Sequence, residues 1–210
     1  MSAKNEILGR IRSALADAPA AEDIPREYRT SSQMSEAELI EMLVDRLIDY
    51  KAGVDVIDAS QVSQVVAAKL GQASSVVYPH GLDTGWLSSL PKGIARHIDE
   101  PGTRLSVAEL DATSAVVTSS AVSIAESGTI ILDGELDQGR RAISLVPDHH
   151  VCIVPVSTIV QLLPEAMPRL TVTRPLTWIS GPSATSDIEL ERVEGVHGPR
   201  VLDVLLVRGL

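Results

Sequence analysis

Aromatic residues are nearly absent from this sequence. They make up 2% of the chain and include no phenylalanine, so the core must be built from valine, isoleucine, leucine and alanine. Positive charge is also scarce, because 18 lysine and arginine residues face 28 aspartate and glutamate residues and leave a formal net charge of -10. Proteins that bind nucleic acids need basic surfaces and, for single strands, aromatic rings on which bases stack. The composition therefore excludes a nucleic-acid-binding function.

Cysteine occurs once, at Cys152. One copy of the chain can therefore form no disulfide bond, and no zinc or iron–sulfur site built from several thiolates. We expect no cofactor of its own, and any iron–sulfur cluster that takes part in its function would belong to a partner protein.

Long hydrophobic runs are missing as well. No stretch approaches the ~18 uninterrupted apolar residues that a membrane-spanning helix needs, and no apolar segment typical of a signal peptide follows the N-terminus. The sequence predicts a cytoplasmic protein without a membrane span.

The chain divides into a short N-terminal appendage, residues 1–34, and one domain, residues 35–210. Residues 2–16 place Ile7, Leu8, Ile11 and Leu15 on one face of a predicted amphipathic helix. A linker rich in proline, alanine and acidic residues follows, so the helix is tethered. Its apolar face either docks on its own domain or packs on another subunit, which would give a homo-oligomer.

Strands and helices alternate through the first half of the domain. Ser35 and Glu38 have the spacing of a capping box before a helix that ends near residue 52. A strand at 54–57, a helix at 61–70 and a strand at 75–78 follow. This pattern predicts an α/β fold with an open, largely parallel sheet and helices on both faces, with ligands near the carboxyl ends of the strands.

The pattern changes after residue 113. Short apolar stretches at 114–118, 122–125 and 129–132 predict a hairpin or meander, in which Glu126, Ser127 and Gly128 form the tight connection. Further along, we expect a buried strand at 151–154, a short helix at 157–163 that Ser157 caps, a buried strand at 176–180 and a last strand at 201–207.

One stretch has the composition of an anion site. Residues 181–189 follow the predicted strand at 176–180 with glycine, proline and small hydroxyl residues, and a helix is expected to begin near Asp187. The unpaired N–H groups of a helix start suit a phosphate or a carboxylate. Glycine and proline at these positions are equally typical of a plain turn.

We predict an anion-selective pocket at the carboxyl edge of the sheet. A protein with a net charge of -10 needs a local cluster of donors to bind an anion. Arginines at this edge would either clamp the anion or form surface ion pairs, and hydroxyl side chains would either bind it or cap the helix. The expected ligand-binding residues are Arg140, Arg141, Gly181, Ser183, Thr185, Asp187 and His197, with the loop at Pro79, His80 and Gly81 as the alternative place.

A metal site is a weaker alternative to this pocket. His150 and His197 with a carboxylate, Glu189 or Asp187, could ligate a metal ion, and imidazoles could also move protons because they titrate near neutral pH. The favoured explanation of both carboxylates is that they are acids in the first turn of a helix, where the helix dipole favours negative charge.

Several segments together resemble the lactate-utilization protein C family, LutC/YkgG, whose domain is the LUD domain. The likeness spans roughly residues 110 to 207 and is carried by residues 125–129, by Gly139-Arg140-Arg141 through Pro147 and His150, by residues 153–155, and by residues 181–189 with residues 195–199. The resemblance implies a fold of the NagB/RpiA/CoA-transferase-like type. It also implies an accessory or ligand-binding role in the oxidation of L-lactate to pyruvate, beside two partner proteins, one of which contains iron–sulfur clusters.

The resemblance names no catalytic residue, but it suggests a rival function. Superfamily relatives that transfer coenzyme A use a glutamate in a similar Glu-x-Gly turn as a covalent nucleophile, and Glu126 stands in such a turn. The protein could therefore be a free-standing transferase or isomerase that acts on an anionic small molecule. The alternative is that Glu126 is a turn residue exposed to water.

Overall fold

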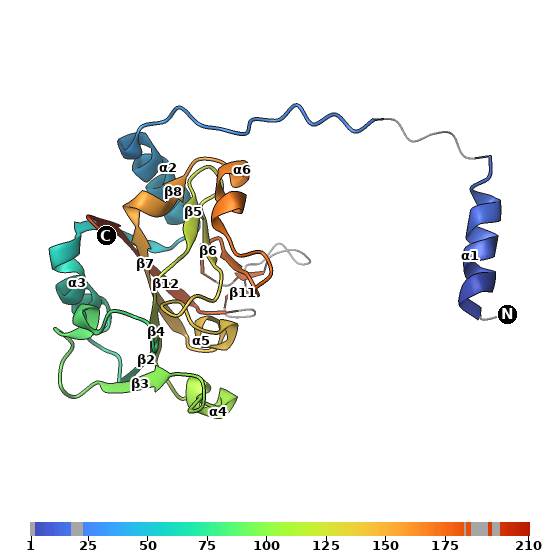
Figure 1. Cartoon of the computed structure of the whole chain (residues 1–210). Coiled ribbons are helices and arrows are strands. Elements are labelled where there is room, and N and C mark those ends of the chain that lie inside the picture. Colours follow the sequence, from blue (N-terminus) through green and yellow to red (C-terminus); the bar gives the residue numbers. More distant parts are fainter. Residues whose placement is uncertain (1–2, 18–22, 183, 186–192, 195–197) are drawn as a thin grey trace.

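The fold is built on a parallel sheet of six strands, shown in Figure 1. The computed structural model describes residues 3–17, 23–182, 184–185, 193–194 and 198–210. The strand order is β1-β12-β7-β4-β2-β3, and every neighbouring pair is parallel. The strands are β1 (Gly53–Asp58), β2 (Ser75–Pro79), β3 (Ala95–Asp99), β4 (Ala115–Thr118), β7 (His149–Pro155) and β12 (Val201–Arg208). The α/β class and the largely parallel sheet are thus confirmed.

One face of this sheet is covered by α3 (Val62–Lys69), which follows η1 (Ala59–Gln61), and by η2 (Thr84–Leu87). Val66 and Leu70 pack there against Val117, Ile153 and other aliphatic side chains of the strands. Full burial of each such side chain contributes about 1.5–3 kcal/mol, so a core without phenylalanine is still sufficient.

The opposite face is covered by α2 (Glu36–Asp49) and by a second sheet. The predicted capping box is present, since Ser35 and Glu38 bond to each other's backbone N–H. The second sheet has the order β8-β5-β6-β9 and consists of β5 (Val122–Ile124), β6 (Thr129–Leu132), β8 (Ile159–Val160) and β9 (Thr177–Ile179). Helices therefore lie on both faces, as predicted.

The predicted hairpin is confirmed for two of its three strands. β5 and β6 pair antiparallel around a turn in which Gly128 has a φ of 63°. The meander is wrong for β4, which lies between β2 and β7 in the large sheet, because its side chains are buried on both faces.

Two other predictions are wrong. Residues 157–163 do not form a helix that Ser157 caps. They contain the end of η3 (Val156–Thr158), the strand β8 and the start of α6 (Leu163–Ala166), because Ile159 and Val160 pair with β5. β9 is not fully buried, since it is the edge strand of the second sheet and Trp178 is 44% exposed.

The other described elements are short. They are α4 (Val107–Asp111), α5 (Arg141–Leu145), η4 (Met167–Arg169), β10 (Ala184–Thr185) and β11 (Val193–Glu194). Across the described residues, no helix is long and apolar enough to cross a membrane.

The first helix, α1 (Ala3–Ala14), forms as predicted but stands apart from the domain, as Figure 1 shows. None of its residues is buried, and its apolar side chains face solvent. The chain contacts the domain from Arg29, which pairs with Glu126, and at Ser32, whose N–H donates to Glu165 (2.9 Å) and whose hydroxyl donates to Gln161. In this structure α1 does not dock on its own domain, and its packing on another subunit stays a prediction.

Candidate functional site

A cavity of about 520 Å³ lies beside the carboxyl ends of β2 and β3, and we call it the strand-end cavity. This is the edge of the parallel sheet where α/β proteins commonly bind ligands. It is lined by His80, Asp99, Glu100, Pro101, Arg104, Leu132, Gly134, Glu135, Leu136, Gly139, Arg140, Arg141, Ala142, Ser144, Pro175 and Thr177. The structure therefore brings together Arg140 and Arg141 of the predicted pocket and His80 of the alternative loop.

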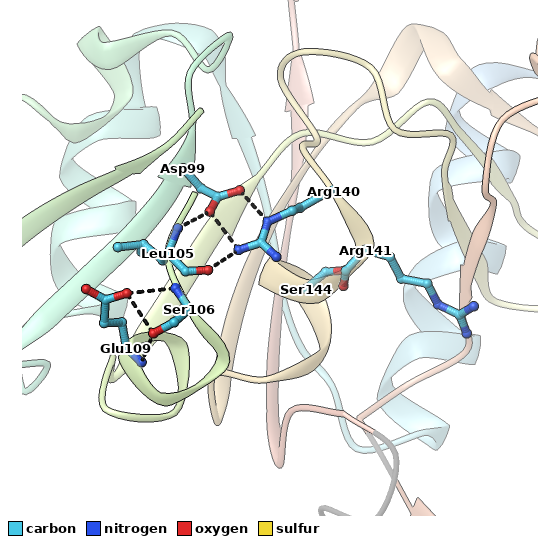
Figure 2. Close-up of polar contacts among 7 residues, drawn as sticks. All are labelled: Asp99, Leu105, Ser106, Glu109, Arg140, Arg141 and Ser144. Atoms are coloured by element: carbon cyan, nitrogen blue, oxygen red, sulfur yellow. Dashed lines mark hydrogen bonds and ion pairs between the residues drawn. The ribbon is translucent and has the colours of Figure 1, made fainter. Parts of the chain in front are cut away.

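Arg140 is held by Asp99, the last residue of β3 (Figure 2). Its Nε donates to Asp99 Oδ2 at 2.8 Å, and its Nη2 donates to Asp99 Oδ1 at 2.9 Å and to the Leu105 carbonyl at 2.5 Å. Burial alone would raise the pKa of Asp99, but the hydrogen bonds from Arg140 and the Leu105 N–H outweigh it and hold that pKa below its usual range. Arg140 is therefore committed to an internal ion pair, whereas the alternative expected from the sequence was an ion pair at the surface.

Arg141 follows directly but points the other way, as Figure 2 shows. Its side chain is exposed at the cavity and forms no ion pair with any described residue. The same holds for Arg104, an exposed residue of the loop after β3. Three acids line the cavity: Asp99 is neutralised by Arg140, Glu135 pairs with Arg174, and Glu100 accepts a bond from the Thr103 hydroxyl. Locally the cavity is thus more positive than the protein as a whole.

A second, smaller cavity of about 110 Å³ adjoins the first, and Ser144 and Thr177 line both. Its wall includes Gly181, Pro182, Gly198, Pro199 and the buried His150. Gly181 has a φ of 85°, which only glycine adopts without strain, and a Cβ there would lie 2.5 Å from the Cβ of Tyr50. The space next to the strand-end cavity is therefore bordered by Gly181 and Pro182 and by Gly198 and Pro199.

His150 and Cys152 are buried on the same face of β7 and are chemically inert there. Burial, with a smaller contribution from the charge of His149, lowers the pKa of His150 to about 3. The ring is thus neutral at neutral pH, and its Nε2 lies 2.8 Å from Thr118 Oγ1. Burial also raises the pKa of Cys152 to about 12, which leaves it as a thiol. Among the described residues, no group of three or more side chains is placed to hold a metal ion.

Glu126 lies in a different place, a groove of about 770 Å³ between the β5–β6 turn and α6. The groove and the strand-end cavity share no lining residue. The Glu126 carboxylate is 44% exposed and accepts two bonds, of 2.7 and 3.0 Å, from Arg29. A carboxylate neutralised by a guanidinium is a poorer nucleophile. Its surroundings therefore resemble those of the exposed turn residue more than those of a catalytic acid.

Several predicted residues lie outside the described part of the chain. These are Ser183, Asp187, Glu189 and His197, and for Thr185 the structure gives only the backbone, in β10. Sequence reasoning missed Asp99 and Arg104, because the region from 87 to 110 has no clear periodicity. The one signal was the capping box at Ser106 and Glu109, which marks the start of α4 behind this loop.

The sequence model of the LUD domain matches residues 28–207. A protein of Deinococcus radiodurans named "Lactate utilization protein C" is 46% identical over 209 residues, which is 98% of this chain and 95% of that protein. Its namesake in Bacillus velezensis is 27% identical over 201 residues, or 86% of this chain and 83% of that protein.

A solved structure is also similar. It is a crystal structure of a DUF162 family protein from Deinococcus radiodurans, with a TM-score of 0.70 and 40% sequence identity. The match covers 83% of this chain and 99% of that chain. The arrangement of strands and helices described above is thus shared with an experimentally determined relative.

Proposed function

Because this chain belongs to the LUD domain family, we propose that it is a ligand-binding accessory component of a cytoplasmic system that oxidises L-lactate to pyruvate. The observation that carries the proposal is the 46% identity, over nearly the whole chain, to a protein named for lactate utilization. The chain has one cysteine, which is buried as a thiol. The electrons of lactate would therefore pass to an iron–sulfur partner.

The strand-end cavity supports the ligand-binding part of the proposal. Arg141 and Arg104 offer guanidinium groups that form no ion pair with described residues, and guanidinium groups recognise carboxylates and phosphates through paired hydrogen bonds. Arg140 bonds to Asp99 and stands directly before Arg141 in the chain. It fixes the end of β3 and the start of α5, from which Arg141 projects.

Growth on L-lactate as the sole carbon source tests the function. A deletion strain without a paralogue should fail to grow, and the intact gene should restore growth. A gene with Arg141→Ala should restore it poorly. Arg208→Ala is the matched control. Arg208 is exposed at the end of β12, so this substitution removes the same charge outside the cavity. Undiminished growth of the deletion strain would exclude the proposed function.

The partner is tested by purification from cells grown on L-lactate. The tagged protein should retain an iron-containing protein, identified by mass spectrometry and by its iron content. Iron-free preparations that contain only the tagged chain would remove the iron–sulfur partner from the proposal.

The second candidate, a transferase reaction through Glu126, is favoured by the opening of the large groove at that carboxylate. Its nucleophile would need release from Arg29, so Arg29→Ala should increase covalent labelling by an acyl-CoA donor, and Glu126→Gln should abolish it. Intact-mass measurement detects the adduct. The same mass for all three proteins after incubation would eliminate this candidate.

A further inference from the structure

The strand-end cavity is much larger than lactate or pyruvate. A water molecule takes about 30 Å³ of liquid volume, so a molecule of six non-hydrogen atoms fills less than roughly 200 Å³ even at that generous share for each atom. The cavity measures about 520 Å³, within the range of about 300–1,000 Å³ in which proteins hold ligands of drug or nucleotide size. More than half of the space would stay empty around lactate.

The walls of the cavity divide into an apolar part and a charged part. Leu136, Pro101, Ala142 and Pro175 supply apolar surface, and Leu136 is 61% exposed because nothing in the described structure covers it. Exposed apolar surface in a cavity is stabilised when a ligand covers it. A ligand that uses this part needs an uncharged body of some size in addition to its anionic group.

Two of the three arginines that line the cavity form no ion pair with a described residue: Arg104 of the loop after β3 and Arg141, the first residue of α5. Arg104 lies near enough to Asp99 for its charge to help lower the pKa of that carboxyl, and Figure 2 shows Arg141 on the other side of Arg140 from Asp99. The Asp99–Arg140 ion pair beside them has no net charge. A single carboxylate can satisfy one of these guanidinium groups, whereas a ligand with two linked anionic groups can contact both.

From the size of the strand-end cavity, its apolar wall and its two arginines without an ion pair to described residues, we infer that it binds an organic diphosphate of nucleotide size. Lactate is not its ligand. The diphosphate contacts Arg104 and Arg141, and the uncharged body lies against Leu136 and Pro175. The inference rests on the proposed function only in taking this cavity as the ligand site.

Calorimetric titration of the full-length protein with ADP, pyrophosphate, adenosine and L-lactate tests the inference. ADP should bind at least about tenfold more tightly than pyrophosphate or adenosine, because only ADP uses both parts of the cavity. Arg141→Ala and Arg104→Ala should each weaken ADP binding about tenfold or more, since each removes a charge-assisted bond. Arg208→Ala, with the same loss of charge, should leave ADP binding unchanged.

Leu136→Ala tests the apolar part separately. Because this side chain is mostly exposed, its truncation should not affect folding, and a thermal melt checks that it does not. The variant should bind ADP about threefold to tenfold more weakly and pyrophosphate as well as the unmodified protein does. Equal losses for both probes, or none for ADP, would overturn the assignment of the uncharged body.

The outcomes separate this inference from the proposed function. Binding of L-lactate without ADP would overturn the inference while the lactate function stands. Binding of ADP that depends on Arg141, together with normal growth of the deletion strain on lactate, would keep the inference and overturn the function. Absence of binding for all four probes would overturn the inference.

Discussion

Replacing Asp99 with asparagine should destabilise the protein markedly. The Asp99 side chain is 4% exposed and accepts bonds from two nitrogens of Arg140 and from the Leu105 N–H. Removing one partner of a buried ion pair typically costs about 3–5 kcal/mol. The Arg140 side chain is 28% exposed and keeps some contact with water, so we expect a loss of about 2–3 kcal/mol in the free energy of unfolding.

Urea denaturation at pH 7 measures this loss as a lower midpoint at unchanged slope. The matched control is Glu135→Gln, which breaks the ion pair between Glu135 and Arg174. Because these side chains are 47% and 41% exposed, the variant should lose no more than about 1 kcal/mol in the free energy of unfolding. The pKa of Asp99 is lowered in the folded state, so its contribution is present above the unfolded pKa of about 3.9 and is lost as the pH falls through the folded pKa. Equal losses for the two variants at pH 7, or a difference that does not shrink as the pH falls below about 3.9, would refute this reasoning.

Between pH 6.5 and about 3, His150 is neutral in the folded protein and takes up a proton only on unfolding, so the free energy of unfolding should fall as the pH drops through that range. The fall should be less steep in His150→Gln. Urea titrations at several pH values measure how the free energy of unfolding of each protein depends on pH, and the same dependence in both would contradict the burial argument. Gly181→Ala should lower the melting temperature more than Gly102→Ala, because both glycines have positive φ but only Gly181 abuts Tyr50. Deleting residues 1–27 should change the melting temperature by less than about 2 °C, since no residue of α1 is buried; a larger drop would mean that α1 docks on the domain.

The sequence was most informative where a pattern is local. The capping box at Ser35 fixed the start of α2, and the β5–β6 turn followed from Gly128, because both depend on residues a few positions apart. β8 was misread as helix because Ile159 and Val160 form a short apolar run whose structure is decided by pairing with β5, far away in the chain.

The candidate site was predictable only in part. The carboxyl edge of the sheet and the arginine pair could be located from the strand pattern. Which of the two arginines forms the internal ion pair could not be predicted, because only the position of Asp99 at the end of β3 distinguishes them. Asp99 lies 41 residues from Arg140, and no spacing rule connects them.

The burial of Cys152 makes the protein convenient for site-specific chemistry. Its thiol is fully buried, and its pKa of about 12 leaves almost no thiolate to react with maleimides or iodoacetamides under native conditions. Since it is the only cysteine, any second one placed on the surface becomes the sole labelled position. A fluorophore attached through Leu136→Cys would report directly on what enters the strand-end cavity, with no background from the native chain.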